Sequence, residues 1–140
     1  MTAITTNPAG LSDADKMAIA SLTQRVVAAW ADYDADAFAD VFTEDGTMVL
    51  AGVYLKGYAA IRDYMADAFE GVYKGTQVTG QPLDMRPLGD DAAILLSQGG
   101  VLEPGESEIS ESAAIHAAWV AVRQDGQWLL AAYQNTPKNN

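Results

Sequence analysis

Apolar residues recur at helical spacing through the first half of the chain. The segment 13–32 carries Ile19, Leu22, Val26 and Trp30 at intervals of three or four residues, which is typical of an amphipathic helix. The pattern predicts three helices, over about 13–32, 35–42 and 58–70. Ser12, with Asp15 three residues later, has the form of an N-terminal cap for the first helix, because a hydroxyl can accept an orphan amide proton.

Extended segments occupy the rest of the chain. A short strand is predicted at 47–50, with 53–55 as its return or as an extended connection. Longer strands are predicted at 76–86 and 91–98, and the two arms of a hairpin at 115–123 and 127–136. Pro82 lacks a ladder donor and implies a bulge or an edge position. The acidic segment 99–111, which contains glycine and proline, is expected to be an exposed excursion between strands.

This order of elements predicts one α+β domain. Helices followed by an antiparallel meander are expected to pack on one face of a curved sheet and to close a cone with an apolar interior, which suits a small-molecule pocket. A chain of 140 residues with 49% hydrophobic content fits one core. We expect a frayed tail at 1–11, the domain at 12–136 and a C-terminal tail at 137–140.

Composition excludes several classes of function. Eight basic and nineteen acidic residues give a net charge of −11, which opposes binding to nucleic acid or to an anionic membrane surface. The chain has no cysteine, so it has no disulfide and no thiolate site. It has no dinucleotide-binding glycine turn and no calcium-loop spacing, so we expect neither a cofactor nor a metal. Without a leader or an apolar run long enough to span a bilayer, it is expected to be soluble and cytoplasmic.

Several short pieces, in this order, resemble one superfamily. They are Trp30, Asp36, Phe38, Phe42 and Asp45-Gly46, then Gly57 with Ala60-Ile61, then Arg86, Leu88-Gly89 and Asp91-Ala92, and finally Arg123, Asp125-Gly126, Trp128, Leu130 and Gln134-Asn135-Thr136. Over residues 12–136 the chain is similar to the nuclear-transport-factor-2-like superfamily, in particular to its SnoaL-like and SgcJ/EcaC-type members.

The resemblance implies a fold and a type of role. It implies the cystatin-like α+β cone and a part in enediyne, polyene or polyketide-derived natural-product biosynthesis, with antibiotic pathways and partner biosynthetic enzymes as the setting. Ketosteroid isomerase shares this fold, but its base would fall at Leu50 and its tyrosine donor near Val26. Neither residue can move a proton, so isomerase chemistry of that kind is not expected.

The length of the loop in the last hairpin decides which side of the sheet its side chains face. A two-residue Asp125-Gly126 turn would place Trp128 opposite Arg123, whereas a three-residue loop with a bulge at Gly126 would pair Val122 with Trp128. We favour the three-residue loop, because it aligns His116 with Gln134 and collects the large apolar residues on the same face. A slip of one residue changes every cross-strand partner.

The favoured register assigns the candidate functional residues. His116 faces the cone and is the candidate catalytic acid–base group, or alternatively a hydrogen-bonded structural histidine. The candidate ligand-binding residues, which could also be ordinary core, share aromatic, thioether, amide or cationic character and are Trp30, Tyr33, Tyr54, Tyr64, Met65, Met85, Arg86, Gln134 and Asn135. The opposite face carries Ile115, Trp119, Leu129 and Tyr133, and we expect it to pack against a second copy in a homodimer.

Two functions of different classes follow. The first is cofactor-independent acid–base catalysis on a hydrophobic polyene or polyketide intermediate, such as a cyclisation or an isomerisation. The second is non-catalytic binding, which sequesters such an intermediate or supports a partner synthase.

Overall fold

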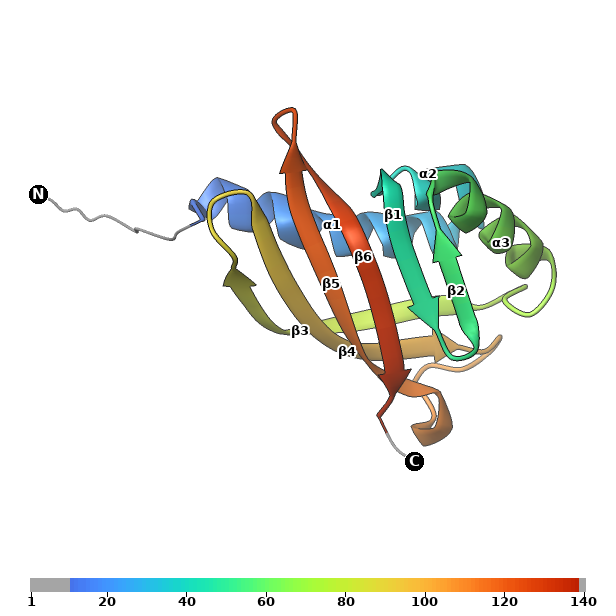
Figure 1. Ribbon diagram of the computed structural model, residues 1–140. Coiled ribbons are helices and arrows are strands. Elements are labelled where there is room, and N and C mark those ends of the chain that lie inside the picture. Colours follow the sequence, from blue (N-terminus) through green and yellow to red (C-terminus); the bar gives the residue numbers. More distant parts are fainter. Residues whose placement is uncertain (1–10, 139–140) are drawn as a thin grey trace, which may run out of the picture.

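Three helices and a six-stranded sheet form the fold (Figure 1). The computed structural model describes residues 11–138. The elements are α1 (Asp13–Ala31), α2 (Ala35–Ala39), β1 (Phe42–Leu50), β2 (Val53–Lys56), α3 (Tyr58–Glu70), β3 (Gln77–Pro87), β4 (Ala92–Leu102), the 3-10 turn η1 (Glu111–Ala113), β5 (Ala114–Gln124) and β6 (Gln127–Pro137). The predicted α+β architecture, with helices packed on a curved and mainly antiparallel sheet, is confirmed.

The strand order in the sheet is β2-β1-β6-β5-β4-β3. Neighbouring strands are antiparallel except for β1 and β6, which are parallel. The helix α1 runs along one face of this sheet, while α2 and α3 lie at the end where β1 and β2 are found (Figure 1). One face of the sheet is therefore covered by helices, and the space between α1 and the strands holds the core.

The start of α1 follows the predicted cap. Ser12 Oγ accepts the backbone N–H of Asp15 at 3.0 Å, and the Asp15 carboxylate accepts the N–H of Ser12 at 3.3 Å, which forms a capping box. Leu11 is only 2% exposed and belongs to the core. Its assignment to a frayed tail was therefore wrong, because an apolar residue just before a cap can fold back onto the first turn. The rest of that predicted tail lies outside the described residues.

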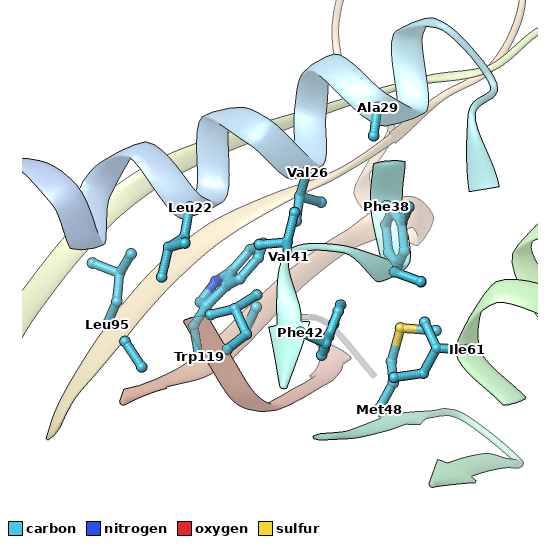
Figure 2. Packing of buried hydrophobic residues seen from close by; sticks show 14 of the residues in the cluster. Leu22, Val26, Ala29, Phe38, Val41, Phe42, Met48, Ile61, Leu95 and Trp119 are labelled. Atoms are coloured by element: carbon cyan, nitrogen blue, oxygen red, sulfur yellow. The ribbon is translucent and has the colours of Figure 1, made fainter. Parts of the chain in front are cut away.

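An apolar stripe of α1 supplies one side of the core. Ile19, Leu22 and Val26 are almost fully buried, as their spacing predicted. Figure 2 shows Leu22 and Val26 pointing from the helix toward the sheet, where Trp119 lies. The other large members of this core come from α2, β1, α3, β4 and β6 and include Phe38, Phe42, Met48, Ile61, Met65, Leu95 and Leu130.

The boundary between α2 and β1 differs from the prediction. The helix ends at Ala39 rather than near 42, and β1 begins at Phe42 rather than at 47. Phe42 pairs with Leu130 of β6, but the next paired residue is Thr47, opposite Ala132, so the residues between them form a bulge. The helical spacing of apolar residues extends to Phe42, which is already the first residue of β1, and the bulge after it hides the regular alternation of a strand.

The tip of the last hairpin is tied to the start of α1. The Arg123 guanidinium contacts Asp15 Oδ1 at 2.8 Å and Asp91 Oδ1 at 3.0 Å, and it also donates to the Asp90 carbonyl oxygen at 2.6 Å. Trp128 Nε1 donates to the same Asp15 oxygen at 3.2 Å, and Arg123 lies 5.0 Å from the centre of the Trp128 ring. One carboxylate therefore caps a helix and anchors a strand pair.

The hairpin register differs from the favoured prediction. Asp125 and Gly126 both have positive φ, 51° and 79°, and form a two-residue turn in which Arg123 pairs with Trp128. Farther along, Ala121 pairs with Leu130 but Val120 pairs with Ala132, so β6 has one extra residue there. The three-residue loop was wrong, and the bulge shifts the pairing a second time.

Two other boundaries also moved. The strand β4 continues to Leu102, so residues 99–102 are not part of the loop predicted at 99–111. The strand β6 ends at Pro137, one residue beyond the predicted end of the domain, and Lys138 still donates its N–H to the Ala114 carbonyl oxygen at 2.8 Å.

Candidate ligand pocket

A cavity of about 1070 Å³ lies between α1 and the sheet. Its walls come from all three helices and all six strands, and they are predominantly apolar. Large apolar lining residues include Val26, Phe42, Leu50, Tyr64, Met65, Met85, Leu95, Val101, Ile115 and Trp119. A cavity of this size and character is typical of a small-molecule site.

Glycines leave the space between β3 and β4 open. Gly80 and Gly99 are cross-strand partners, and both line the cavity. A Cβ atom added to Gly80 would meet no atom within 4 Å, whereas one added to Gly99 would overlap the Thr79 carbonyl oxygen. The first glycine therefore has open space beside it at the cavity wall, and the second permits a close approach of two backbones. Figure 1 shows β3 and β4 bending strongly along their length.

Two hydrogen-bonded pairs supply polarity in the wall. Trp119 Nε1 donates to Ser97 Oγ at 2.8 Å, and Asn135 Nδ2 donates to Tyr133 Oη at 2.9 Å. The rings of Trp119 and Tyr133 meet edge to face with centroids 4.5 Å apart. These contacts fix the orientation of both aromatic side chains beside the cavity.

Tyr73 and Tyr133 are held in their neutral forms. Burial raises the pKa of Tyr73 to about 12, and the neighbouring phenol of Tyr64 adds to the effect. Burial also raises the pKa of Tyr133, although the hydrogen bond from Asn135 opposes that shift. Both phenols therefore keep their protons at neutral pH and can act as hydrogen-bond donors rather than as bases.

Five of the predicted ligand-binding residues line the cavity. They are Trp30, Tyr64, Met65, Met85 and Asn135. Two predicted tyrosines lie outside it: Tyr54 is 66% exposed, and Tyr33 is 40% exposed and donates to the Thr76 carbonyl oxygen at 3.2 Å. Arg86 is also exposed and outside the lining. The aromatic composition of these segments indicated a pocket without showing which rings face it.

His116 and Gln134 face away from the cavity. Ala117 and Trp119 are buried and line it, so the alternation along β5 places His116 on the outer face, where it is exposed and pairs with Thr136. Gln134 is likewise exposed, opposite Ala118. The inward orientation predicted for His116 was wrong because it rested on the three-residue loop, and that of Gln134 was wrong because the extra residue at Ala131 reverses the facing of the residues after it.

The predicted dimer face is largely reversed by two differences, the two-residue turn and the extra residue at Ala131. Ile115, Trp119 and Tyr133 line the cavity instead of the outer face. Leu129 stays on the outer side, opposite Val122, because its neighbours Trp128 and Leu130 are buried. The set therefore does not form one surface.

Six lining residues with polar groups were missed, namely Thr23, Gln24, Tyr73, Thr79, Asp84 and Ser97. Tyr73 follows α3 and packs on Trp30, with ring centroids 4.5 Å apart. Ser97 continues the alternation of Ala93 and Leu95 on β4, so the period of two could have indicated its inward direction. Asp84 follows the bulge after Pro82, and beyond a bulge the alternation of the strand no longer predicts which side of the sheet a residue faces.

The sequence and the fold both match known proteins. Residues 13–134 match the SnoaL-like domain, which covers most of the chain. The chain belongs to the SnoaL-like family. No curated protein has a sequence that matches this one.

Solved structures agree with this family and its fold. A cystatin-like domain of unknown function from Nostoc punctiforme is 28% identical, with a TM-score of 0.86 over 93% of this SnoaL-like chain and 81% of its own. A nuclear-transport-factor-2-like protein from Novosphingobium aromaticivorans is 19% identical, with a TM-score of 0.79 over 91% and 84%. A putative aromatic ring hydroxylase from the same species is 20% identical, with a TM-score of 0.72 over 94% of each chain.

Two further features of the described residues bear on function. Within 11–138, no group of three or more histidine, aspartate or glutamate side chains could hold a metal ion. No helix in that part of the chain is long and apolar enough to cross a bilayer.

Proposed function

We propose that this SnoaL-like protein binds a hydrophobic small molecule in the cavity between α1 and the sheet. The observation that carries the proposal is an apolar space of about 1070 Å³ with few polar groups in its wall. Family membership supports the same role, because SnoaL-like domains bind small-molecule ligands. A polyene or polyketide-type molecule fits this chemistry, since Trp30, Trp119 and Tyr133 offer aromatic surfaces to a conjugated ligand.

Binding without catalysis is the function that the side chains favour. His116, the candidate acid–base group, is exposed on the opposite side of the sheet. Among the described lining residues, Asp84 is the single carboxylate; it is exposed at the cavity wall, and it favours cofactor-independent acid–base catalysis as a second candidate. If a substrate is turned over, Asp84→Asn will reduce the rate and leave binding in place.

The experiment is a titration with Nile red, a neutral dye that fluoresces in apolar surroundings. The wild-type protein is expected to bind it saturably. Gly80→Phe should weaken binding by about tenfold or more, because the new ring enters the open space beside a residue that lines the cavity. Gly80→Ala is the matched control and should bind like the wild type. Equal binding by Gly80→Phe, with an unchanged circular dichroism spectrum, would remove the cavity as the site.

We also propose a homodimer through the outer face of the sheet, with a corrected set of residues. Supporting it, the outward side chains of β4, β5 and β6 are mainly apolar and partly exposed: Ile94, Leu96, Ala118, Val120, Val122, Leu129 and Ala132. Sedimentation velocity of the wild type and of Val120→Asp tests this, and a monomeric wild type at micromolar concentration contradicts it. A cytoplasmic location, partner biosynthetic enzymes and a link to enediyne pathways stay predictions.

A further inference from the structure

Two hydroxyl groups in the cavity wall each have an unused proton. Ser97 Oγ accepts the N–H of Trp119, and Tyr133 Oη accepts an N–H of Asn135. Each hydroxyl also carries one proton of its own, for which the described part of the chain shows no acceptor. An unpaired donor beside an apolar space is costly, so an oxygen atom of a ligand would satisfy it.

The two hydroxyls lie on either side of the same ring. Trp119 of β5 reaches Ser97 on β4 through its indole nitrogen, and it pairs across the sheet with Tyr133 of β6. Ser97 is 7% exposed and Trp119 is 8% exposed. A flat ligand resting on this indole would meet one hydroxyl donor toward each neighbouring strand.

Within residues 11–138, the lining of the cavity offers no counter-charge for an anion. None of the described lining residues is lysine, arginine or histidine, and the single charged side chain among them is the carboxylate of Asp84. The whole chain carries a net charge of −11. An anionic head group would therefore lose its hydration without gaining a cationic partner, and the long-range field would repel it.

We propose that the pocket selects neutral ligands with carbonyl oxygens, such as ketones, esters or quinones, and rejects carboxylates and phosphates. Tyr133 and Ser97 donate hydrogen bonds to the ligand oxygens, while the apolar walls hold the hydrocarbon part. Tyr133 is then a specificity-determining residue. This inference rests on the proposed function, because it specifies the chemistry of the molecule bound in the same cavity.

The test compares methyl retinoate with retinoic acid near neutral pH. Both share one polyene skeleton, but the first ends in a neutral ester and the second in a carboxylate. Displacement of Nile red should show methyl retinoate binding at least about tenfold more tightly to the wild type. Tyr133→Phe should weaken methyl retinoate roughly three- to tenfold, which corresponds to one lost hydrogen bond. The ester carbonyl stretch in the infrared should shift to lower frequency in the wild type only.

Tyr54→Phe is the matched control, since Tyr54 is 66% exposed and lies outside the lining. It should leave both affinities unchanged. Equal or tighter binding of retinoic acid, or an unaltered affinity in Tyr133→Phe, would overturn the inference. Displacement by neither retinoid would also overturn it if Nile red binds. If Nile red itself does not bind to the wild type, the proposed function fails first, so the two failures are distinguishable.

Discussion

The paired glycines of β3 and β4 should respond in opposite ways to the same substitution. Gly80 and Gly99 face each other across two strands, yet only one has room for a side chain. At Gly99 an added Cβ would overlap the Thr79 carbonyl oxygen and lie 2.9 Å from Gly80 Cα. Both neighbours are backbone atoms, which cannot rotate away, so the strands would have to separate.

These distances set the expected free energies of unfolding. Overpacking costs typically about 1–3 kcal/mol, and we expect Gly99→Ala to lie at the upper end, near 3 kcal/mol, because no flexible side chain can absorb the clash. Gly80→Ala should instead stabilise the protein by about 0.5 kcal/mol, since the methyl group enters free space and restricts the unfolded chain. The two variants should thus differ by about 3.5 kcal/mol.

Urea unfolding monitored by tryptophan fluorescence measures both variants against the wild type. Equal slopes would show that the denatured states are comparable, so that the midpoints report stability. A Gly99→Ala protein that unfolds within about 0.5 kcal/mol of the wild type, or a Gly80→Ala protein that is the less stable variant, would refute this explanation.

Three other outcomes follow from the structure. The hydrogen bond from Trp128, followed by the contacts with Ser12 and Arg123, lowers the pKa of Asp15. The stabilisation by its carboxylate is therefore present above the ordinary pKa of 3.8 and is lost as the pH falls through the lower pKa of the folded state. The melting temperatures of Asp15→Asn and the wild type should converge in that pH range, and a difference between them that grows in acid would contradict this. The phenol absorbance of Tyr73 should titrate near pH 12, and the stabilising effect of this residue should decline from about pH 10 upward. Tyr73→Phe should therefore remove the absorbance change near pH 12, and an unchanged titration curve would count against the assignment. His116→Ala should leave Nile red binding unaltered, because the side chain lies on the outer face, and a clear loss of affinity would place it in the site after all.

Regular periodicity was enough to predict most of the fold. The third helix was predicted over 58–70 and is found at Tyr58–Glu70, because Ile61, Met65, Ala68 and Phe69 keep one apolar face throughout. The cap at Ser12 was likewise readable, since its partner Asp15 is local in sequence. Elements whose stabilising contacts are local were the ones that the sequence revealed.

Irregular pairing could not be predicted in the same way. The additional residue at Ala131 shifts β6 against β5, and the segment between Phe42 and Thr47 bulges where β1 meets β6. Each irregularity reverses the facing of the residues beyond it. For this reason Tyr133 was assigned to the outer face and Gln134 to the pocket, whereas Trp119 was misplaced because the turn has two residues rather than three.

The position of β6 between β1 and β5 imposes an order on folding during synthesis. The strand β1 has only the short β2 as its other neighbour, and its parallel partner follows every other element in the sequence. Until β6 has left the ribosome, the apolar face of β1 has no completed sheet to join, although α1 and α3 can already form. Strands so far apart in the sequence pair slowly, so the nascent chain passes through a stage in which the edge of β1 has unpaired backbone N–H and C=O groups that can pair with another chain. Slower translation of the last strand would extend that stage and increase the demand for chaperones.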